Sequence, residues 1–232
     1  MNIEASQFFK QNHYLKISQF ITPEEASFLY DYTKLAAVRL VTLEKNQTEL
    51  SDRDIGQFGT FNDGQVNGVY SQYGDLVFDT LLVRKLSIVE NLIGLQLIAN
   101  YSFNRLYTTG AELVRHKDRP SCEISTTLCL GYDVSNIDLE KYPDWDWPMY
   151  VGPNNGQTGT TGTPIHMKPG DMIIYRGCEI EHWREPFEGL NHAQVFLHYN
   201  EKDGQYGIAN DGRPALGLPG NYKTFTSNEL EV

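Results

Sequence analysis

Basic side chains are scarce in this chain of 232 residues. The sequence holds 19 lysines and arginines against 30 aspartates and glutamates, which gives a formal net charge of −11. Affinity for nucleic acids depends largely on basic side chains that neutralise phosphates. Because no basic cluster here is longer than two residues, we expect no nucleic-acid partner.

Long apolar segments are also missing. No run of 18 apolar residues occurs, so we expect no transmembrane helix and no membrane partner. The first 14 residues lack the basic start and the apolar stretch that together form a secretory signal peptide. The sequence therefore predicts a cytoplasmic protein.

Cysteine is rare, and its spacing excludes two classes of small stabilised domain. Cys122, Cys129 and Cys178 cannot all pair with one another, and no Cys-x-x-Cys motif occurs. This excludes a disulfide framework and gives no sign of a structural zinc site. We expect buried free thiols, the usual state of isolated cysteines.

The first part of the chain predicts two helices. Thr22 can cap a helix that has Pro23 at its first position and Glu25 in a capping box. A second helix is expected shortly before Gly94, because apolar residues recur at helical spacing up to that glycine. Residues 39–70, between the two, are polar and show only weak strand signals.

After residue 95 the pattern changes to short segments rich in β-branched and aromatic residues, separated by turns. The fold class expected is mainly β (α+β), in a single domain. Residues 1–97 would form a helical support region, 98–200 a β core and 201–232 a coil tail. Residues 152–164 form a long loop of Gly, Thr and Asn.

A His-x-Asp motif at His116 and Asp118 suggests a metal site. On an extended segment both side chains point to one face, because the strand period is two. His182, 64 residues after Asp118, can supply a third ligand. Two imidazoles and one carboxylate form the facial triad of non-haem iron oxygenases, which leaves coordination positions open. The motif by itself is also compatible with solvated surface.

The context of these residues resembles a known family. Residues 105–118 are similar to the Tyr-x-x-Gly stretch and His-x-Asp motif of the Fe(II)/2-oxoglutarate-dependent dioxygenases, in their prolyl 4-hydroxylase-like branch. Residues 168–199 resemble that branch's second half, with a Gly-Asp turn, a strand and the distal histidine. The resemblance implies a double-stranded β-helix (jelly-roll) core with N-terminal helices packed against one sheet. It also implies that His116, Asp118 and His182 are the iron ligands.

The residue that anchors 2-oxoglutarate departs from the family pattern. Prolyl 4-hydroxylases have a lysine ten residues after the distal histidine, and His192 stands there in this chain. A protonated histidine can hold a carboxylate. Arg184, two residues after His182, is the other candidate cation. By the resemblance, the hydroxyl of Tyr107 helps to hold the same carboxylate. The sequence does not decide whether Arg184 or His192 binds this carboxylate.

Other polar residues near the motifs receive simpler interpretations. We expect His166 to be structural and His198 to contribute to packing. Lys117, between two candidate ligands, should point away from the metal. Arg119 and Glu123 are candidate substrate contacts.

The resemblance implies a 2-oxoglutarate-dependent hydroxylase whose cofactors are Fe(II), 2-oxoglutarate and O₂ and whose products include succinate and CO₂. Halogenating relatives replace the carboxylate ligand with a small residue, so Asp118 favours hydroxylation. The substrate would be a peptidyl proline or a small amino-acid-like molecule. The alternative is a metal-binding jelly-roll or cupin module without 2-oxoglutarate turnover. A cupin enzyme that needs no keto acid would usually have more clustered histidines.

Overall fold

The computed structural model describes residues 2–46 and 56–223 and contains two antiparallel sheets. In the six-stranded sheet the order is β1 (Tyr14–Ile17), β8 (Met172–Tyr175), β5 (Ile124–Asp133), β10 (Asn191–Glu201), β3 (Leu97–Thr108) and β2 (Tyr70–Tyr73). In the four-stranded sheet the order is β4 (Leu113–His116), β9 (His182–Arg184), β6 (Met149–Val151) and β7 (Thr163–Ile165). The predicted class, mainly β with some helices, is confirmed.

The helices are α1 (Ile3–Asn12), α2 (Pro23–Lys45) and α4 (Leu76–Ile93). Thr22 caps α2 and forms a capping box with Glu25, as predicted. Gly94, in the left-handed conformation, ends α4. The sequence analysis did not predict α1, and α2 extends into the segment read as a weak strand. Part of that segment, 47–55, lies outside the described residues.

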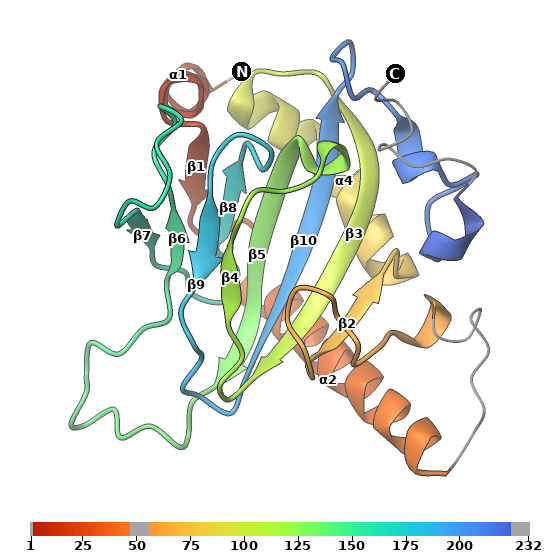
Figure 1. The fold of residues 1–232 in the computed structure, drawn as a ribbon, viewed down its shortest axis with the longest axis vertical. Coiled ribbons are helices and arrows are strands. Elements are labelled where there is room, and N and C mark those ends of the chain that lie inside the picture. Colours follow the sequence, from red (N-terminus) through yellow and green to blue (C-terminus); the bar gives the residue numbers. More distant parts are fainter. Residues whose placement is uncertain (1, 47–55, 224–232) are drawn as a thin grey trace.

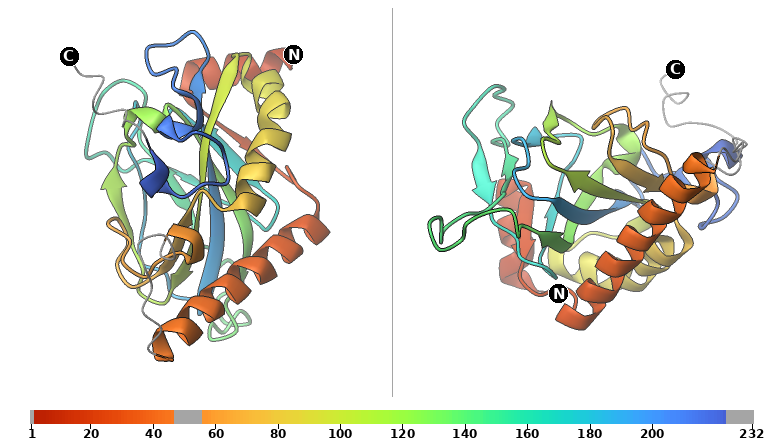
Figure 2. Two further views of the ribbon diagram at one scale, coloured as in Figure 1. Left: turned by 90° about the vertical axis from the view of Figure 1, so that its right-hand side faces the viewer. Right: turned by 90° about the horizontal axis from the view of Figure 1, so that it is seen from below.

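The molecule is layered. Figure 1 shows the four-stranded sheet in front of the six-stranded sheet, with α2 and α4 behind it. Figure 2 shows both helices along the same side of the molecule. The six-stranded sheet therefore has one face toward the helices and one toward the smaller sheet.

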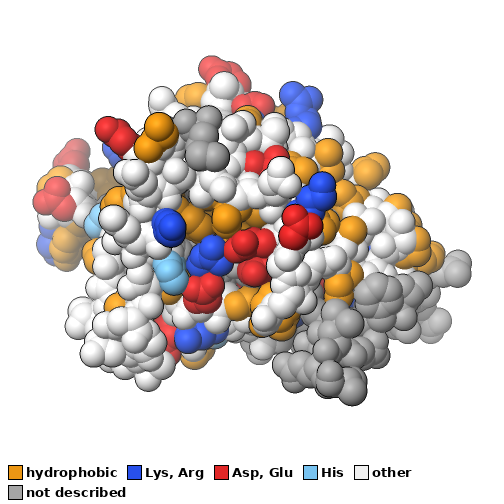
Figure 3. All heavy atoms as spheres, turned by 90° about the horizontal axis from the view of Figure 1, so that it is seen from above, with side chains coloured by type: hydrophobic (Ala, Val, Ile, Leu, Met, Phe, Trp, Pro, Cys, Tyr) orange, Lys and Arg blue, Asp and Glu red, His pale blue; other side chains and the backbone are white. Residues whose placement is uncertain are grey.

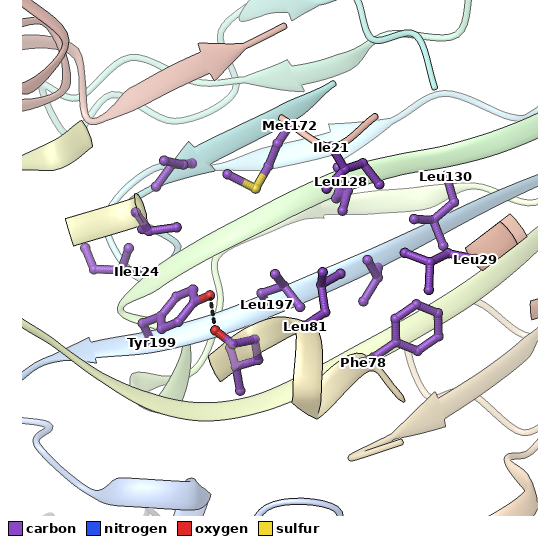
Figure 4. Close-up of a cluster of buried hydrophobic side chains, with 14 of the residues drawn as sticks. Ile21, Leu29, Phe78, Leu81, Ile124, Leu128, Leu130, Met172, Leu197 and Tyr199 are labelled. Atoms are coloured by element: carbon purple, nitrogen blue, oxygen red, sulfur yellow. Dashed lines mark hydrogen bonds between the residues drawn. The ribbon is translucent and has the colours of Figure 1, made fainter. Parts of the chain in front are cut away.

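Strand β10 shows why the site lies between the sheets. Val195 and Leu197 point to the helices and join the main core, where Phe78 and Leu81 of α4 also pack. The hydroxyl of Tyr199 donates to the carbonyl oxygen of Leu82 at 3.0 Å (Figure 4). Burial of each such large apolar side chain stabilises the fold by about 1.5–3 kcal/mol. The alternate residues of β10 face the other sheet, and most of them are polar.

The segment after β10 is more ordered than the predicted coil. It contains two short 3-10 helices, η2 (Ala209–Gly212) and η3 (Gly220–Tyr222). Asp211, 3% exposed, receives hydrogen bonds from the hydroxyl of Tyr73 at 2.7 Å and from Arg119 at 2.6 and 2.9 Å, and pairs with Lys223. Through the hydrogen bond with Tyr73 of β2, this carboxylate connects the C-terminal segment to the large sheet. Residues 224–232 lie outside the described part.

Cys122, Cys129 and Cys178 are free, and the first two are buried. On the face drawn in Figure 3, acidic and basic side chains are interspersed rather than separated by sign. Among the residues described, no helix has both the length and the apolar character needed to cross a bilayer.

Candidate active site

The pairing of β4 with β9 brings two histidines together. His116 is directly opposite His182 in the antiparallel register, and their ring centroids are 4.3 Å apart. Oδ1 of Asp118 lies 3.5 Å from Nε2 of His116 and 3.4 Å from Nε2 of His182. The structure therefore places the three predicted ligands in one cluster, at the end of the small sheet.

Asp118 is held on both sides. Its backbone N–H donates to the carbonyl oxygen of Gly177 at 2.9 Å, and its Oδ2 accepts from the hydroxyl of Ser125 at 2.7 Å. Burial acts to raise the pKa of Asp118, but His182 and His116 outweigh it and hold this pKa well below its ordinary value. The side chain is an ionised carboxylate whose Oδ1 faces both imidazoles.

These residues fit a divalent iron ion. One ligand atom from each of His116, Asp118 and His182 lies within 4.8 Å of the others, and two imidazoles with one carboxylate are the donor set that Fe(II) oxygenases use. Asp118, Cys122 and His198 form a second group at the same spacing. Burial raises the pKa of Cys122 well above its ordinary value, which disfavours the thiolate form that a metal binds.

A buried arginine lies two residues beyond the distal histidine. Arg184 is 1% exposed, and its Nη1 donates to the carbonyl oxygen of Trp147 at 2.6 Å. Among the described residues, its Nε and Nη2 have no hydrogen-bond partner, and no carboxylate forms an ion pair with it. Burial lowers the pKa of this guanidinium, but arginine stays charged in proteins. A buried unpaired cation is costly, and an anionic ligand would compensate its charge.

The other two candidate anchors border the same region. Tyr107 is fully buried and its hydroxyl accepts from Nη1 of Arg105 at 3.0 Å. His192 is 3% exposed, and burial together with the Arg184 charge lowers its pKa well below the ordinary value. The sequence left His192 open as the second candidate cation. Burial and the neighbouring Arg184 charge disfavour its protonated form, so Arg184 is the stronger candidate, and the identity of the anchor stays a prediction.

A cavity of about 490 Å³ opens beside the three candidate ligands. Its walls carry aromatic rings together with charged and polar side chains, among them Tyr73, Tyr101, Phe103, Tyr175, Phe196, Asp63, Gln65, Arg105, Lys117, Arg119, Lys223 and His198. The loop that carries Asp63 and Gln65 contributes to the wall, and an ion pair of 2.6 Å between Asp63 and Arg105 holds it there. Residues 152–164 do not line this cavity.

The remaining predicted residues fall into two groups. Arg119 lines the cavity, whereas Glu123 does not and instead accepts from the backbone N–H of Glu201. Lys117 also lines the cavity, although the sequence suggested that it points away. His166 is exposed and pairs with Asp146, remote from the ligands.

His198 was assigned to packing, and the structure places it in the cavity wall. The sequence pattern could have predicted this position. Val195 and Leu197 lie on the strand face that packs against the helices, so His198, at the next position, must lie on the opposite face.

Comparisons with known proteins were made by sequence and by structure. No family model matches the sequence, and no curated protein sequence matches it. Among solved structures, a prolyl-4-hydroxylase of Pseudomonas putida has a TM-score of 0.53 and 14% identity, with 87% of this chain and 99% of that chain covered.

Two further structures cover even more of this chain. The non-haem alpha-ketoglutarate-dependent carbocyclase SnoK of nogalamycin biosynthesis has a TM-score of 0.60 and 15% identity, covering 94% of this chain and 93% of its own. HygX of Streptomyces hygroscopicus, solved with nickel, 2-oxoglutarate and hygromycin B bound, has a TM-score of 0.60 and 12% identity, covering 99% of this chain and all of its own. The chain has the fold of the 2-oxoglutarate-Fe(II) oxygenases, a group that includes the prolyl 4-hydroxylases.

Proposed function

We propose that this protein is an Fe(II)- and 2-oxoglutarate-dependent oxygenase that hydroxylates a small molecule. One observation carries the proposal: a 2-His-1-carboxylate cluster and a buried, unpaired guanidinium lie on the same strand pair. His182 and Arg184 are two residues apart on β9, so both side chains point to one face about 6.6 Å apart along the strand. A five-carbon dicarboxylate can bridge that separation.

Each residue has a role in this proposal. His116, Asp118 and His182 hold Fe(II), and the two sheets around them form a double-stranded β-helix in a single catalytic domain. Arg184 pairs with the distal carboxylate of 2-oxoglutarate through Nε and Nη2, which lack partners among the described residues. Such charge-assisted bonds are about twice as strong as neutral ones.

Tyr107 and His192 complete the co-substrate pocket. The Tyr107 ring packs edge-on against Trp147 at 5.0 Å, and the Arg184 guanidinium lies over the same indole at 4.4 Å. His192 packs edge-on against that indole too, at 5.0 Å. These contacts fix the position of the guanidinium and exclude water from it. When bound, Fe(II) and 2-oxoglutarate supply the O₂-derived oxidant, with release of succinate and CO₂.

A small molecule fits the cavity better than a peptidyl proline. The volume of about 490 Å³ is typical of small-molecule sites, and the charged side chains of Asp63 and Arg105 in its wall offer polar contacts to a small ligand. HygX was solved with hygromycin B, and SnoK belongs to nogalamycin biosynthesis. The Pseudomonas putida prolyl-4-hydroxylase favours the peptide alternative. A cytoplasmic location stays a prediction.

The test is an anaerobic titration of the protein with Fe(II) and then 2-oxoglutarate, following the visible charge-transfer band of the chelate. We expect the band in the native protein and in His166→Ala, a control at an exposed histidine. We expect it to disappear in His116→Ala. Iron binding without a band in the native protein would contradict the proposal.

A metal-binding module without turnover is the second candidate. It predicts iron binding by His116, Asp118 and His182 but no succinate when 2-oxoglutarate and O₂ are added. The unpaired Arg184 argues against it, because a binding module without an anionic ligand gains nothing from a buried guanidinium that lacks a partner.

A further inference from the structure

His198 occupies a defined place beside the candidate metal site. It lies on the inward face of β10, is 6% exposed and lines the cavity together with His116, Asp118 and His182. Its ring packs on Tyr101 with centroids 4.5 Å apart and is parallel to Phe196 at 6.4 Å. The imidazole is therefore held between these two rings, with its Nδ1 edge toward Ser125.

A hydrogen-bond chain fixes which ring nitrogen carries the proton. The hydroxyl of Ser125 lies 2.7 Å from Oδ2 of Asp118 and 3.0 Å from Nδ1 of His198. A hydroxyl has one hydrogen to donate, and an ionised carboxylate can only accept. The shorter, charge-assisted bond to Asp118 takes that hydrogen. Nδ1 of His198 must then be the donor, and its hydrogen points at the Ser125 oxygen.

The ring is neutral in this environment. Burial favours the neutral form, since His198 is 6% exposed and, among the described residues, its ring nitrogens form no hydrogen bond or ion pair with a carboxylate. A neutral imidazole with its hydrogen on Nδ1 has a lone pair on Nε2. Among residues 2–46 and 56–223, no side chain or backbone group donates a hydrogen bond to Nε2.

We propose that Nε2 of His198 accepts a hydrogen bond from the substrate, and that the substrate is therefore a small molecule with a hydroxyl or amine group close to the carbon that is oxidised. This inference rests on the proposed function, because it places the reacting carbon at the iron site. The aromatic wall formed by Tyr101, Phe103 and Phe196 contacts the apolar part of the same molecule.

The tautomer can be measured before any substrate is known. Nitrogen-15 NMR of the full chain, labelled at histidine and loaded with diamagnetic Zn²⁺, reports the protonation of each ring nitrogen. Comparison with His198→Asn assigns the His198 signals. We expect a neutral ring protonated at Nδ1. A ring protonated at Nε2, or an imidazolium at neutral pH, would overturn the inference.

Matched probes test the hydrogen bond itself. Cyclohexanol, cyclohexylamine and methoxycyclohexane share a ring and differ in whether they can donate. We measure their binding to the anaerobic Fe(II)·2-oxoglutarate complex by the change in its visible band. At least one of the two donors should bind about tenfold more tightly than the ether, and the better of them distinguishes a hydroxyl from an amine substrate.

Variants at position 198 separate the two ring nitrogens. His198→Asn can still reach Ser125 but presents no acceptor at the Nε2 position, so the preference for donors should disappear. His198→Gln extends an amide oxygen toward that position and should retain part of it. His166→Gln, at an exposed histidine, is the matched control.

Three outcomes would overturn the proposed substrate class. The ether binds as tightly as the donors, none of the probes binds, or His198→Asn keeps the preference for donors. In each case a visible band in the native complex shows that the proposed function still stands, whereas absence of the band removes the proposed function itself.

Discussion

Gly177 and Asp118 approach so closely that a β-carbon at position 177 would lie 2.3 Å from Oδ2 of the aspartate. The same β-carbon would lie 2.6 Å from the Ser125 hydroxyl oxygen. Distances below 3.0 Å cannot be accommodated without movement, since protein interiors are closely packed. Position 177, two residues after the end of β8, therefore requires glycine for space, and the geometry of the carboxylate ligand depends on it.

Gly177→Ala should consequently disturb the iron site more than the fold. We expect Fe(II) affinity to fall by at least about tenfold, as when groups that orient a metal ligand are displaced. Gly152→Ala is a suitable control, because its β-carbon would meet its nearest neighbour at 3.4 Å, an ordinary contact. Anaerobic Fe(II) titration of both variants measures the effect. Equal affinities would show that Asp118 is not constrained by this glycine.

Removal of the Ser125 hydroxyl tests the orientation of Asp118 without a steric clash. Ser125→Ala leaves Oδ2 without the 2.7 Å hydrogen bond, and partners of this kind are typically worth 10- to 100-fold in metal affinity. We expect Fe(II) binding to weaken within about that range. Ser6→Ala, which removes an exposed hydroxyl bonded only to the backbone of α1, should leave the affinity unchanged. An unchanged affinity in Ser125→Ala would contradict the assignment of Asp118 as an oriented ligand.

Arg184 and His192 make different contributions to co-substrate binding. Arg184→Gln removes the buried cation, and loss of hydrogen bonds to a charged group costs about 1.5–3 kcal/mol. The Kd for 2-oxoglutarate should rise roughly 10- to 150-fold, measured by the visible band at saturating Fe(II). His192→Phe removes a neutral ring and should raise that Kd less than about tenfold. A larger effect from His192→Phe would identify the histidine as the main anchor.

The sequence predicted the fold where local signals dominate. The capping box at Thr22 and Glu25, and the glycine at position 94, mark helix ends by short-range chemistry. Helix α1 escaped prediction because it is short, and its packing against α4 comes from tertiary structure rather than from its own sequence. The C-terminal segment was read as coil because its order comes from Asp211, whose partners are distant in sequence.

The candidate site was predictable where residue type and spacing suffice. His116, Asp118 and His182 were named from the motif and its context, and the structure brings them together. The choice between Arg184 and His192 depends on burial and on their mutual charge, which only the folded chain defines. The proposed role of His198 also depends on the folded chain, because it follows from the position of Ser125 on a neighbouring strand.

Asp211 should make stability depend on pH. Burial acts to raise the pKa of Asp211, but Arg119 and Lys223 hold it below its ordinary value. In the unfolded chain this carboxyl titrates near its reference value of about 3.9. As pH falls through that value, the unfolded state takes up a proton that the folded state does not, so the free energy of unfolding decreases. Its contribution is fully present above that range and is lost progressively below it.

Asp211→Asn tests this linkage, because it removes the charge and leaves Arg119 and Lys223 without their carboxylate. We expect the free energy of unfolding at pH 7 to fall by about 3 kcal/mol and its slope against pH below about pH 5 to flatten. Urea unfolding at several pH values measures both quantities. Asp203→Asn, at an exposed carboxylate, should retain the native slope. If Asp211→Asn also retains it, the ion pairs with Arg119 and Lys223 do not stabilise the C-terminal segment, and other contacts hold it, among them those of Arg213 and Gly217 with Asp79.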